Sequence, residues 1–239
     1  MLYSNVTPTG SDIRYNETSE TVMVVGGSIA HGWEDPNNDS YIRRAFQSLT
    51  ESTNTTYNYV DRTQVGGSPT SVSPQQFQKW LNQYHPNVVV LSWGFLNDAD
   101  KKTSSDKIGT AISREISAAL TEGSVVLVVS PPVTEASESR LKSLTDAYVA
   151  KEFSVAKSFH SKNVYELDVL NRMRAYLAAH DQSVDLYAAN SWHPNQAGHI
   201  LAGELLYNDL IETFGQSPIL AKHHIGQRNS TVSGTKQSS

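Results

Sequence analysis

The chain has 239 residues, a formal net charge of −5 at pH 7 and no cysteine. This charge argues against a nucleic-acid-binding surface, and the lack of cysteine excludes disulfides, thiolate chemistry and cysteine metal ligands. No stretch of about 18 consecutive apolar residues occurs, so no membrane-spanning helix is expected.

The composition along the chain predicts one domain with two polar ends. Residues 1–20 are predicted to form an N-terminal arm, residues 21–215 the domain, and residues 216–239 a polar C-terminal tail. The first residues lack the charged and apolar regions of a signal peptide. Because Asn, Ser, Thr and Gln are abundant, we expect the mature form of an extracellular or cell-envelope protein rather than a cytoplasmic one.

The first predicted strand, Val22 to Val25, runs directly into Gly26-Gly27-Ser28 and then into sequence that is compatible with a helix. Glycine before the serine is expected to let the backbone turn and approach its neighbours closely. Amide groups at the start of a helix can face developing negative charge. The setting therefore suits Ser28 as a nucleophile.

Five predicted strands alternate with helices along the rest of the chain. The strands are expected at 22–25, 56–61, 87–93, 124–130 and 163–167, and the helices at 40–50, 74–84, 104–121, 138–160, 169–179 and 195–214. This alternation predicts the α/β class, a flavodoxin-like three-layer α/β/α doubly wound sandwich around a five-stranded parallel sheet. The ligand site of such a sheet lies beyond the carboxyl ends of its strands.

Several polar groups fall where they would meet at that edge: Ser28, Gly66 with Gly67, Asn97, and His193 at the start of the last helix. This order of Ser, Gly, Asn and His resembles the SGNH hydrolases, also called the GDSL esterase/lipase superfamily. The match extends over residues 21–210 and implies the SGNH hydrolase fold. It further implies a carboxylic ester hydrolase that works without a metal or another cofactor.

The resemblance assigns a role to each matching residue. Ser28 corresponds to the nucleophile and His193 to the base that takes its proton. The oxyanion hole would be formed by the backbone N–H of Ser28, the backbone N–H of Gly67 or its neighbour Gly66, and the side chain of Asn97.

Two positions depart from the family pattern. Gly27 stands where the family has an aspartate before the serine, and Asn190 stands where it has an acid three residues before the histidine. An amide oxygen can hold the imidazole tautomer but stabilises an imidazolium only weakly. Three alternatives stay open: Asn190 orients His193 in a Ser-His dyad, Asp185 or another nearby carboxylate supplies the acid, or the chain is an impaired relative.

The expected partner is a small-molecule or carbohydrate ester with a short acyl group, for instance acetyl, because the loops between the strands look too short for a lid or a lipid channel. Trp33, Trp93 and Trp192 lie next to the motifs, either stacking on a sugar or packing in the core. The sequence gives no oligomeric state. His31 is predicted on the first helical turn after Ser28, facing solvent or substrate.

Two other functions remain as hypotheses. The first is a catalytically impaired, carbohydrate-binding relative of the same fold. The second is a nucleotide-binding flavodoxin-like protein, although the chain lacks Gly-x-Gly-x-x-Gly and a phosphate loop with lysine. His223 and His224 have no partners at metal-ligand spacing, so no metal site is expected there.

Overall fold

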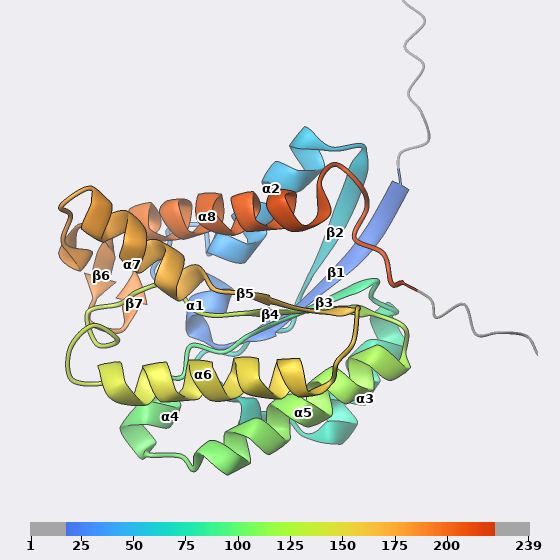
Figure 1. Cartoon of the computed structure of the whole chain (residues 1–239), viewed down its shortest axis with the longest axis horizontal. Coiled ribbons are helices and arrows are strands. Elements are labelled where there is room, and N and C mark those ends of the chain that lie inside the picture. The colour runs from blue at the N-terminus through green and yellow to red at the C-terminus, as the bar shows by residue number, and fades with distance from the viewer. Residues whose placement is uncertain (1–17, 223–239) are drawn as a thin grey trace, which may run out of the picture.

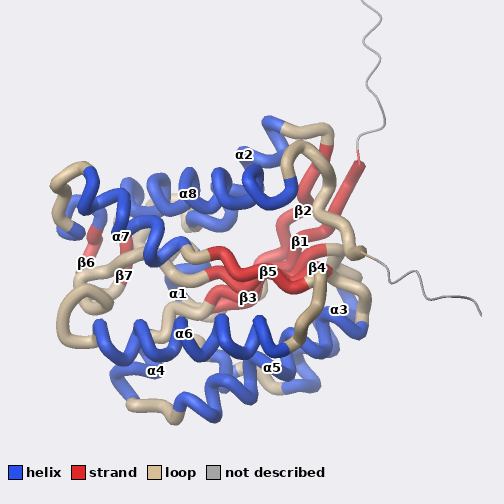
Figure 2. Tube along the Cα trace, in the orientation of Figure 1, coloured by secondary structure: helices blue, strands red, loops and turns tan. Residues whose placement is uncertain are grey.

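The computed structural model describes residues 18–222. Five parallel strands form the central sheet in the order β2-β1-β3-β4-β5, and helices cover both of its faces (Figure 2). The strands are β1 (Thr18–Gly26), β2 (Thr55–Asp61), β3 (Val88–Ser92), β4 (Val125–Val129) and β5 (Val164–Leu167). The predicted fold class is therefore confirmed.

The helices form two layers (Figure 1). One face carries α2 (Tyr41–Ser52), α7 (Val169–Ala179) and α8 (Gln196–Phe214). The other carries α3 (Pro74–Tyr84), α4 (Leu96–Lys101), α5 (Ser105–Thr121) and α6 (Lys142–Ser158). The short helix α1 (Ser28–His31) follows β1, and the 3-10 turns are η1 (Pro69–Ser71) and η2 (Val184–Tyr187). None of the helices in residues 18–222 is both long and apolar enough to cross a membrane.

The central strands are apolar because both of their faces are covered. β3 and β4 are buried along their whole length and pair in parallel from Val88 with Val125 onward. β1 lies between β2 and β3, so its carboxyl end at Gly26 has a strand on each side. This arrangement places Ser28 at the carboxyl edge of the sheet, beyond an inner strand.

Several helices begin where a polar side chain caps the first turn. At α2, Ser40 accepts a hydrogen bond from the backbone N–H of Arg43. At α3, Ser73 accepts one from the backbone N–H of Gln76. At α8, Asn195 accepts from the N–H of Gly198 at 2.9 Å. Such caps satisfy backbone donors that have no partner inside the helix. The cap at Asn195, two residues after His193, also fixes the start of α8 at Gln196.

The structure differs from the prediction in some elements. α6 begins at Lys142 rather than at 138, because Thr134 and Ser137 hydrogen-bond each other's backbone N–H and hold a turn there. The helix α4 and the antiparallel pair β6 (Ala188–Asn190) and β7 (His193–Pro194) were not predicted.

Some residues that were predicted to lie in the arm and the tail belong to the folded domain. β1 starts at Thr18, so residues 18–20 belong to the sheet rather than to the predicted arm. Ile219, in the predicted tail, is buried, and its backbone N–H donates to the hydroxyl of Tyr57. Residues 1–17 and 223–239, with His223 and His224, lie outside the described residues.

Candidate active site

Ser28 and His193 meet at the carboxyl edge of the sheet. Ser28 is the first residue of α1, directly after β1, and His193 begins β7 of the short hairpin that contacts α1 (Figure 1). The side-chain Oγ of Ser28 lies 2.9 Å from Nε2 of His193. This distance is a hydrogen bond between a hydroxyl and an imidazole nitrogen, the geometry that a nucleophile and its base require.

The hairpin also brings Asn190 to the other side of the imidazole. Its Oδ1 lies 2.9 Å from the backbone nitrogen of Trp192, 3.1 Å from the backbone nitrogen of His193 and 3.1 Å from the Nδ1 atom of His193. Backbone N–H groups only donate, so the Asn190 atom that they meet is the accepting oxygen. Nδ1 of His193 must then carry the hydrogen, and Nε2 is left to accept the proton of Ser28.

The surroundings favour the neutral form of His193. Burial lowers the pKa of its imidazole, and the negative charge of Glu34 partly offsets that effect. A neutral imidazole is the form that can act as a base. Glu34 follows α1 with a left-handed backbone, φ 73°. This carboxylate was not predicted as part of the site, because only the folding of the loop after α1 brings it close to residue 193.

A small pocket surrounds these groups. It is lined by residues 27–29, 94–97 and 192–193 together with Gly67, and its volume is about 10 Å³. Asn97 reaches the pocket from the first turn of α4, and its side-chain amide has no hydrogen-bond partner within residues 18–222. An unpaired amide donor beside the serine hydroxyl fits an oxyanion site.

Gly67 lines the same pocket, but its backbone N–H donates to the carbonyl of Gln64 at 2.9 Å. Gly66, which does not line the pocket, takes the left-handed φ of 75° that this tight turn needs. The structure thus brings Ser28, Asn97 and Gly67 together, while the Gly67 N–H is already used within its own turn.

The loop after β3 holds Asn97 through a strained residue. Phe95 has a left-handed backbone, φ 58°, and its ring packs against Tyr148 with 5.9 Å between the ring centroids. A left-handed non-glycine residue costs about 1 kcal/mol or more and persists only where its surroundings enforce it. Trp93, at the start of this loop, is fully buried and hydrogen-bonded to Glu115, so it packs in the core rather than against substrate.

The two glycines before Ser28 differ in how closely their neighbours pack against them. A Cβ on Gly26 would lie 2.1 Å from the carbonyl oxygen of Ser92, whereas a Cβ on Gly27 would lie 3.5 Å from its nearest neighbour, the carbonyl oxygen of Gly67. The close approach expected before Ser28 therefore belongs to Gly26. Gly27 has an extended backbone, φ −90°, that other residues also adopt.

Other candidates lie away from the imidazole. Asp185 is exposed in η2, and within residues 18–222 its side chain makes no hydrogen bond or ion pair to His193. His31 lies on α1, as predicted, but its Nδ1 is 2.9 Å from the Oγ1 of Thr63. Across the described part of the chain, no group of three or more acidic or histidine side chains is placed to hold a metal ion.

The profile of the GDSL-like Lipase/Acylhydrolase family matches residues 24–201. The chain belongs to this family. The resemblance to SGNH hydrolases is thereby confirmed, and so is the prediction of a carboxylic ester hydrolase. No curated protein matches the chain in sequence.

Solved structures share the fold of this GDSL-like chain at low identity. The psychrotrophic esterase EstA from Pseudoalteromonas, inhibited by monoethylphosphonate, is 12% identical with a TM-score of 0.62, over 81% of this chain and 98% of its own. A lipolytic G-D-S-L protein from Veillonella parvula is 16% identical with a TM-score of 0.64, over 82% of this chain and 99% of its own.

A third structure is larger. It is a two-domain esterase described as active on acetylated mannans, 14% identical with a TM-score of 0.67. The match covers 84% of this chain and 51% of that one. The GDSL-like chain thus corresponds to about half of the two-domain enzyme.

Proposed function

We propose that this GDSL-like esterase hydrolyses short-chain acyl esters through an acyl-enzyme, with Ser28 as nucleophile, His193 as base and Asn190 as the residue that positions the base. The observation that carries the proposal is the 2.9 Å hydrogen bond between Ser28 Oγ and His193 Nε2. Two residues that lie 165 positions apart in the chain meet in the geometry that acyl transfer requires.

The reaction begins when Ser28 Oγ attacks the ester carbonyl carbon and its proton passes to Nε2 of His193. The carbonyl oxygen becomes an oxyanion, which accepts hydrogen bonds from the backbone N–H of Ser28 and the side-chain amide of Asn97. When the tetrahedral intermediate collapses, the alcohol leaves with the proton from His193. Water then attacks the acyl-serine by the same sequence of proton transfers and releases the acid.

A carboxylate at this position would hold the imidazole tautomer and stabilise the imidazolium, and Asn190 does only the first. Its Oδ1 holds the hydrogen on Nδ1, so the tautomer that accepts from Ser28 is the one present before attack. It carries no charge to stabilise the imidazolium. The carboxylate of Glu34, which raises the pKa of His193, supplies part of that charge from a distance.

The size of the pocket supports a short acyl group. Its volume of about 10 Å³ is close to the room that one water molecule needs. A pocket this small favours the smallest acyl groups over long alkyl chains. The ester hydrolysed in preference is therefore an acetate.

A carbohydrate is the proposed carrier of that acyl group. Trp192 lines the pocket and is half-buried, and the guanidinium of Arg140 lies 5.6 Å from the centre of its ring. Trp33, on the loop after α1, is 42% exposed. A partly exposed aromatic ring beside an ester site, as Trp192 provides, suits stacking against a sugar. The similarity to an esterase active on acetylated mannans supports the same class.

The test compares p-nitrophenyl acetate with p-nitrophenyl octanoate in the wild type and in Ser28→Ala, together with labelling by a fluorophosphonate. The proposal expects acetate to be preferred and both hydrolysis and labelling to be lost in Ser28→Ala. A wild type that neither labels nor hydrolyses acetate would favour the alternative of an impaired, carbohydrate-binding relative. Equal hydrolysis by Ser28→Ala would remove Ser28 from the mechanism.

A further inference from the structure

Ser28 lies on a very short helical turn. The helix α1 (Ser28–His31) has four residues, and a helix of this length is not stable in isolation. Gly27 caps its start without a side-chain hydrogen bond, at the position where the SGNH resemblance leads us to expect an aspartate. The orientation of Ser28 therefore depends on the contacts that α1 makes with other segments.

The side chain of His31 makes such a contact. Within residues 18–222, the side chains of α1 form two hydrogen bonds with other segments. One is the bond between Ser28 and His193, which belongs to the proposed reaction. The other joins Nδ1 of His31 to Oγ1 of Thr63, at 2.9 Å. This second bond is the one that can hold the turn before the reaction begins.

The direction of the bond follows from the other partner of Thr63. The hydroxyl of Thr63 donates to Oδ1 of Asp61, the last residue of β2, at 2.5 Å. A hydroxyl has one hydrogen, so Thr63 accepts from His31, and Nδ1 of His31 carries the donated hydrogen. Oδ2 of Asp61 lies 3.4 Å from the same Nδ1 and is a second acceptor. These three side chains form a hydrogen-bond relay from α1 to the end of β2.

The far end of this relay is fixed to the strand that leads to Ser28. The backbone N–H groups on either side of Thr63, those of Arg62 and Gln64, donate to carbonyls of β1 at 2.8 and 2.9 Å. The backbone N–H of Thr63 itself donates to Asp61 at 2.8 Å. The segment after β2 is thus held against β1, and the relay ties the turn of Ser28 back to its own strand.

We propose that His31 is a positioning residue, which acts through Thr63 and Asp61 to hold the turn that carries Ser28. The inference rests on the proposed function of Ser28 as the nucleophile. The close packing of Gly26 against β3 sets where the turn begins, and the relay sets how the turn is oriented. A reacting group displaced by about 1 Å can lose about a hundredfold in rate. Loss of the relay should therefore lower kcat and leave ester binding nearly unchanged.

The first test changes the donor of the relay, with p-nitrophenyl acetate as the ester. His31→Ala removes the donor, so we expect kcat to fall roughly tenfold or more while KM stays within about twofold. His31→Asn keeps an N–H donor near the position of Nδ1, so its kcat should stay within about threefold of the wild type. An unchanged kcat in His31→Ala, or an equal loss in both variants, would overturn the proposal.

The second test changes the acceptor. Thr63→Val removes the hydroxyl at nearly constant shape and should lower kcat at least about threefold, whereas Thr63→Ser keeps the hydroxyl and should stay within about twofold. The double variant His31→Ala/Thr63→Val should lose no more than the worse single variant, because both changes break the same bond. Losses that multiply would contradict the relay. If His31→Ala does not fold, the two Thr63 variants decide alone.

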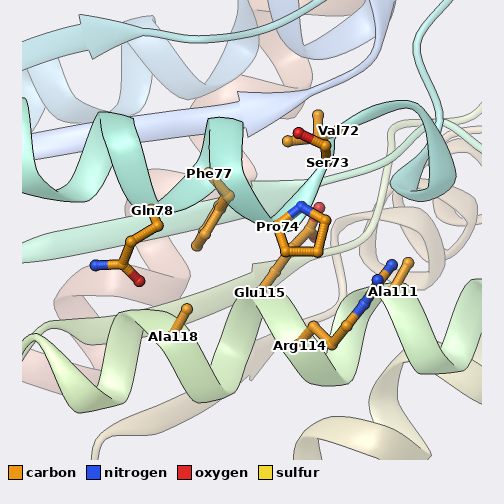
Figure 3. A pocket seen from close by; sticks show the side chains of 9 residues that line it. All are labelled: Val72, Ser73, Pro74, Phe77, Gln78, Ala111, Arg114, Glu115 and Ala118. Atoms are coloured by element: carbon orange, nitrogen blue, oxygen red, sulfur yellow. The ribbon is translucent and has the colours of Figure 1, made fainter.

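A control separates positioning from a general loss of stability. Phe77 lines a cavity between α3 and α5, and this cavity shares no lining residue with the Ser28 pocket (Figure 3). Phe77→Leu should lower the thermal midpoint of unfolding, as smaller side chains in the core do, and leave kcat near that of the wild type. If it lowered kcat as much as His31→Ala at the same midpoint, stability would explain both losses and the proposal would fail.

NMR of the imidazole rings tests the relay without any substrate. Long-range ¹H–¹⁵N spectra at about pH 8.5, above the range in which histidine ordinarily titrates, show which ring nitrogen carries the hydrogen. We expect Nδ1 in His31, and we expect Thr63→Val to shift the ring signals of His193 because Ser28 moves. A hydrogen on Nε2 of His31, or His193 signals that stay in place, would refute the relay even in a protein that hydrolyses no ester. The proposed function fails separately, if Ser28→Ala is as active as the wild type.

Discussion

The Oδ1 atom of Asn190 lies 3.1 Å from Nδ1 of His193, at the position where the SGNH resemblance leads us to expect a carboxylate. The contact satisfies the imidazole N–H and fixes the tautomer, but it places a neutral amide beside the ring. The proposed mechanism therefore has a correctly oriented base with less electrostatic support for its protonated form.

The first prediction concerns that missing charge. Asn190→Asp keeps the size of the side chain and the acceptor oxygen, and it adds a negative charge beside Nδ1 of His193. We expect the pKa of His193 to rise by about 1–2 units, as it does when a carboxylate approaches within hydrogen-bond distance. Above that pKa, kcat for p-nitrophenyl acetate should rise roughly tenfold, because the imidazolium formed during attack gains a counter-charge.

Asn190→Ala is the matched control, since it removes the acceptor without adding a charge. Its activity should fall, but less than that of His193→Ala, which has no base at all. If Asn190→Asp were slower than the wild type at every pH while Asn190→Ala was unaffected, Asn190 would not position the base. Steady-state kinetics between about pH 5 and 9, the range in which histidine titrates, decide between these outcomes.

A second prediction uses the charge of Glu34. Catalysis requires neutral His193, so kcat/KM should rise with pH through the pKa of this residue, which burial holds below its ordinary value. The negative charge of Glu34 raises that pKa, and Glu34→Gln removes the effect. The acid limb of the profile should therefore move to lower pH. Glu204→Gln, an exposed carboxylate on α8, is the control and should leave the limb in place.

Most of the framework was predictable because its signals are local. The apolar run that ends at Gly26 indicated a buried strand leading to Ser28, and the other strands and long helices carried similarly clear patterns. The spacing of Asn190 and His193 also indicated that they belong together. The pair β6 and β7, which presents them, is too short to show a periodicity of its own.

The remaining features of the site depend on contacts between distant segments. The bond from the N–H of Gly67 to Gln64 arises in a turn whose geometry the glycine pair alone does not specify. The approach of Glu34 to His193 depends on the loop after α1. The burial of Trp93 against Glu115 joins the end of β3 to α5, and no local pattern indicates which tryptophan is buried.

The third prediction addresses the oxyanion hole. Asn97→Ala should lower kcat for p-nitrophenyl acetate by about 10²–10³-fold with little change in KM, because its amide donates mainly to charge that develops in the transition state. Asp100→Ala, an exposed position on the same helix α4, should retain activity. A purely structural role for Asn97 would instead lower the thermal midpoint of unfolding together with activity. Differential scanning fluorimetry measures that midpoint.

A fourth prediction separates the dyad from the alternative acid. Asp185 is exposed in η2, and its carboxylate has no hydrogen bond or ion pair to His193 in the described part of the chain. We therefore expect Asp185→Asn to keep kcat/KM within about twofold of the wild type, as for other surface substitutions. If Asp185→Asn proved as damaging as His193→Ala, Asp185 would be the acid and the Ser-His dyad would be refuted.

The last prediction is about stability at the strand end. In Gly26→Ala the added Cβ would overlap the carbonyl oxygen of Ser92, at 2.1 Å, so β1 and β3 would have to separate locally. We expect a loss of about 1–3 kcal/mol in the free energy of unfolding. In Gly27→Ala the nearest atom is 3.5 Å away, and the loss should stay within about 0.5 kcal/mol.

Urea unfolding followed by circular dichroism compares these two glycine variants directly, since Gly26 ends β1 and Gly27 joins it to Ser28. A similar midpoint for both would mean that β1 can shift without cost. In that event the close packing of Gly26 against Ser92 would not be what holds the serine at the sheet edge. A lower midpoint for Gly26→Ala alone would identify this contact as the one that positions Ser28.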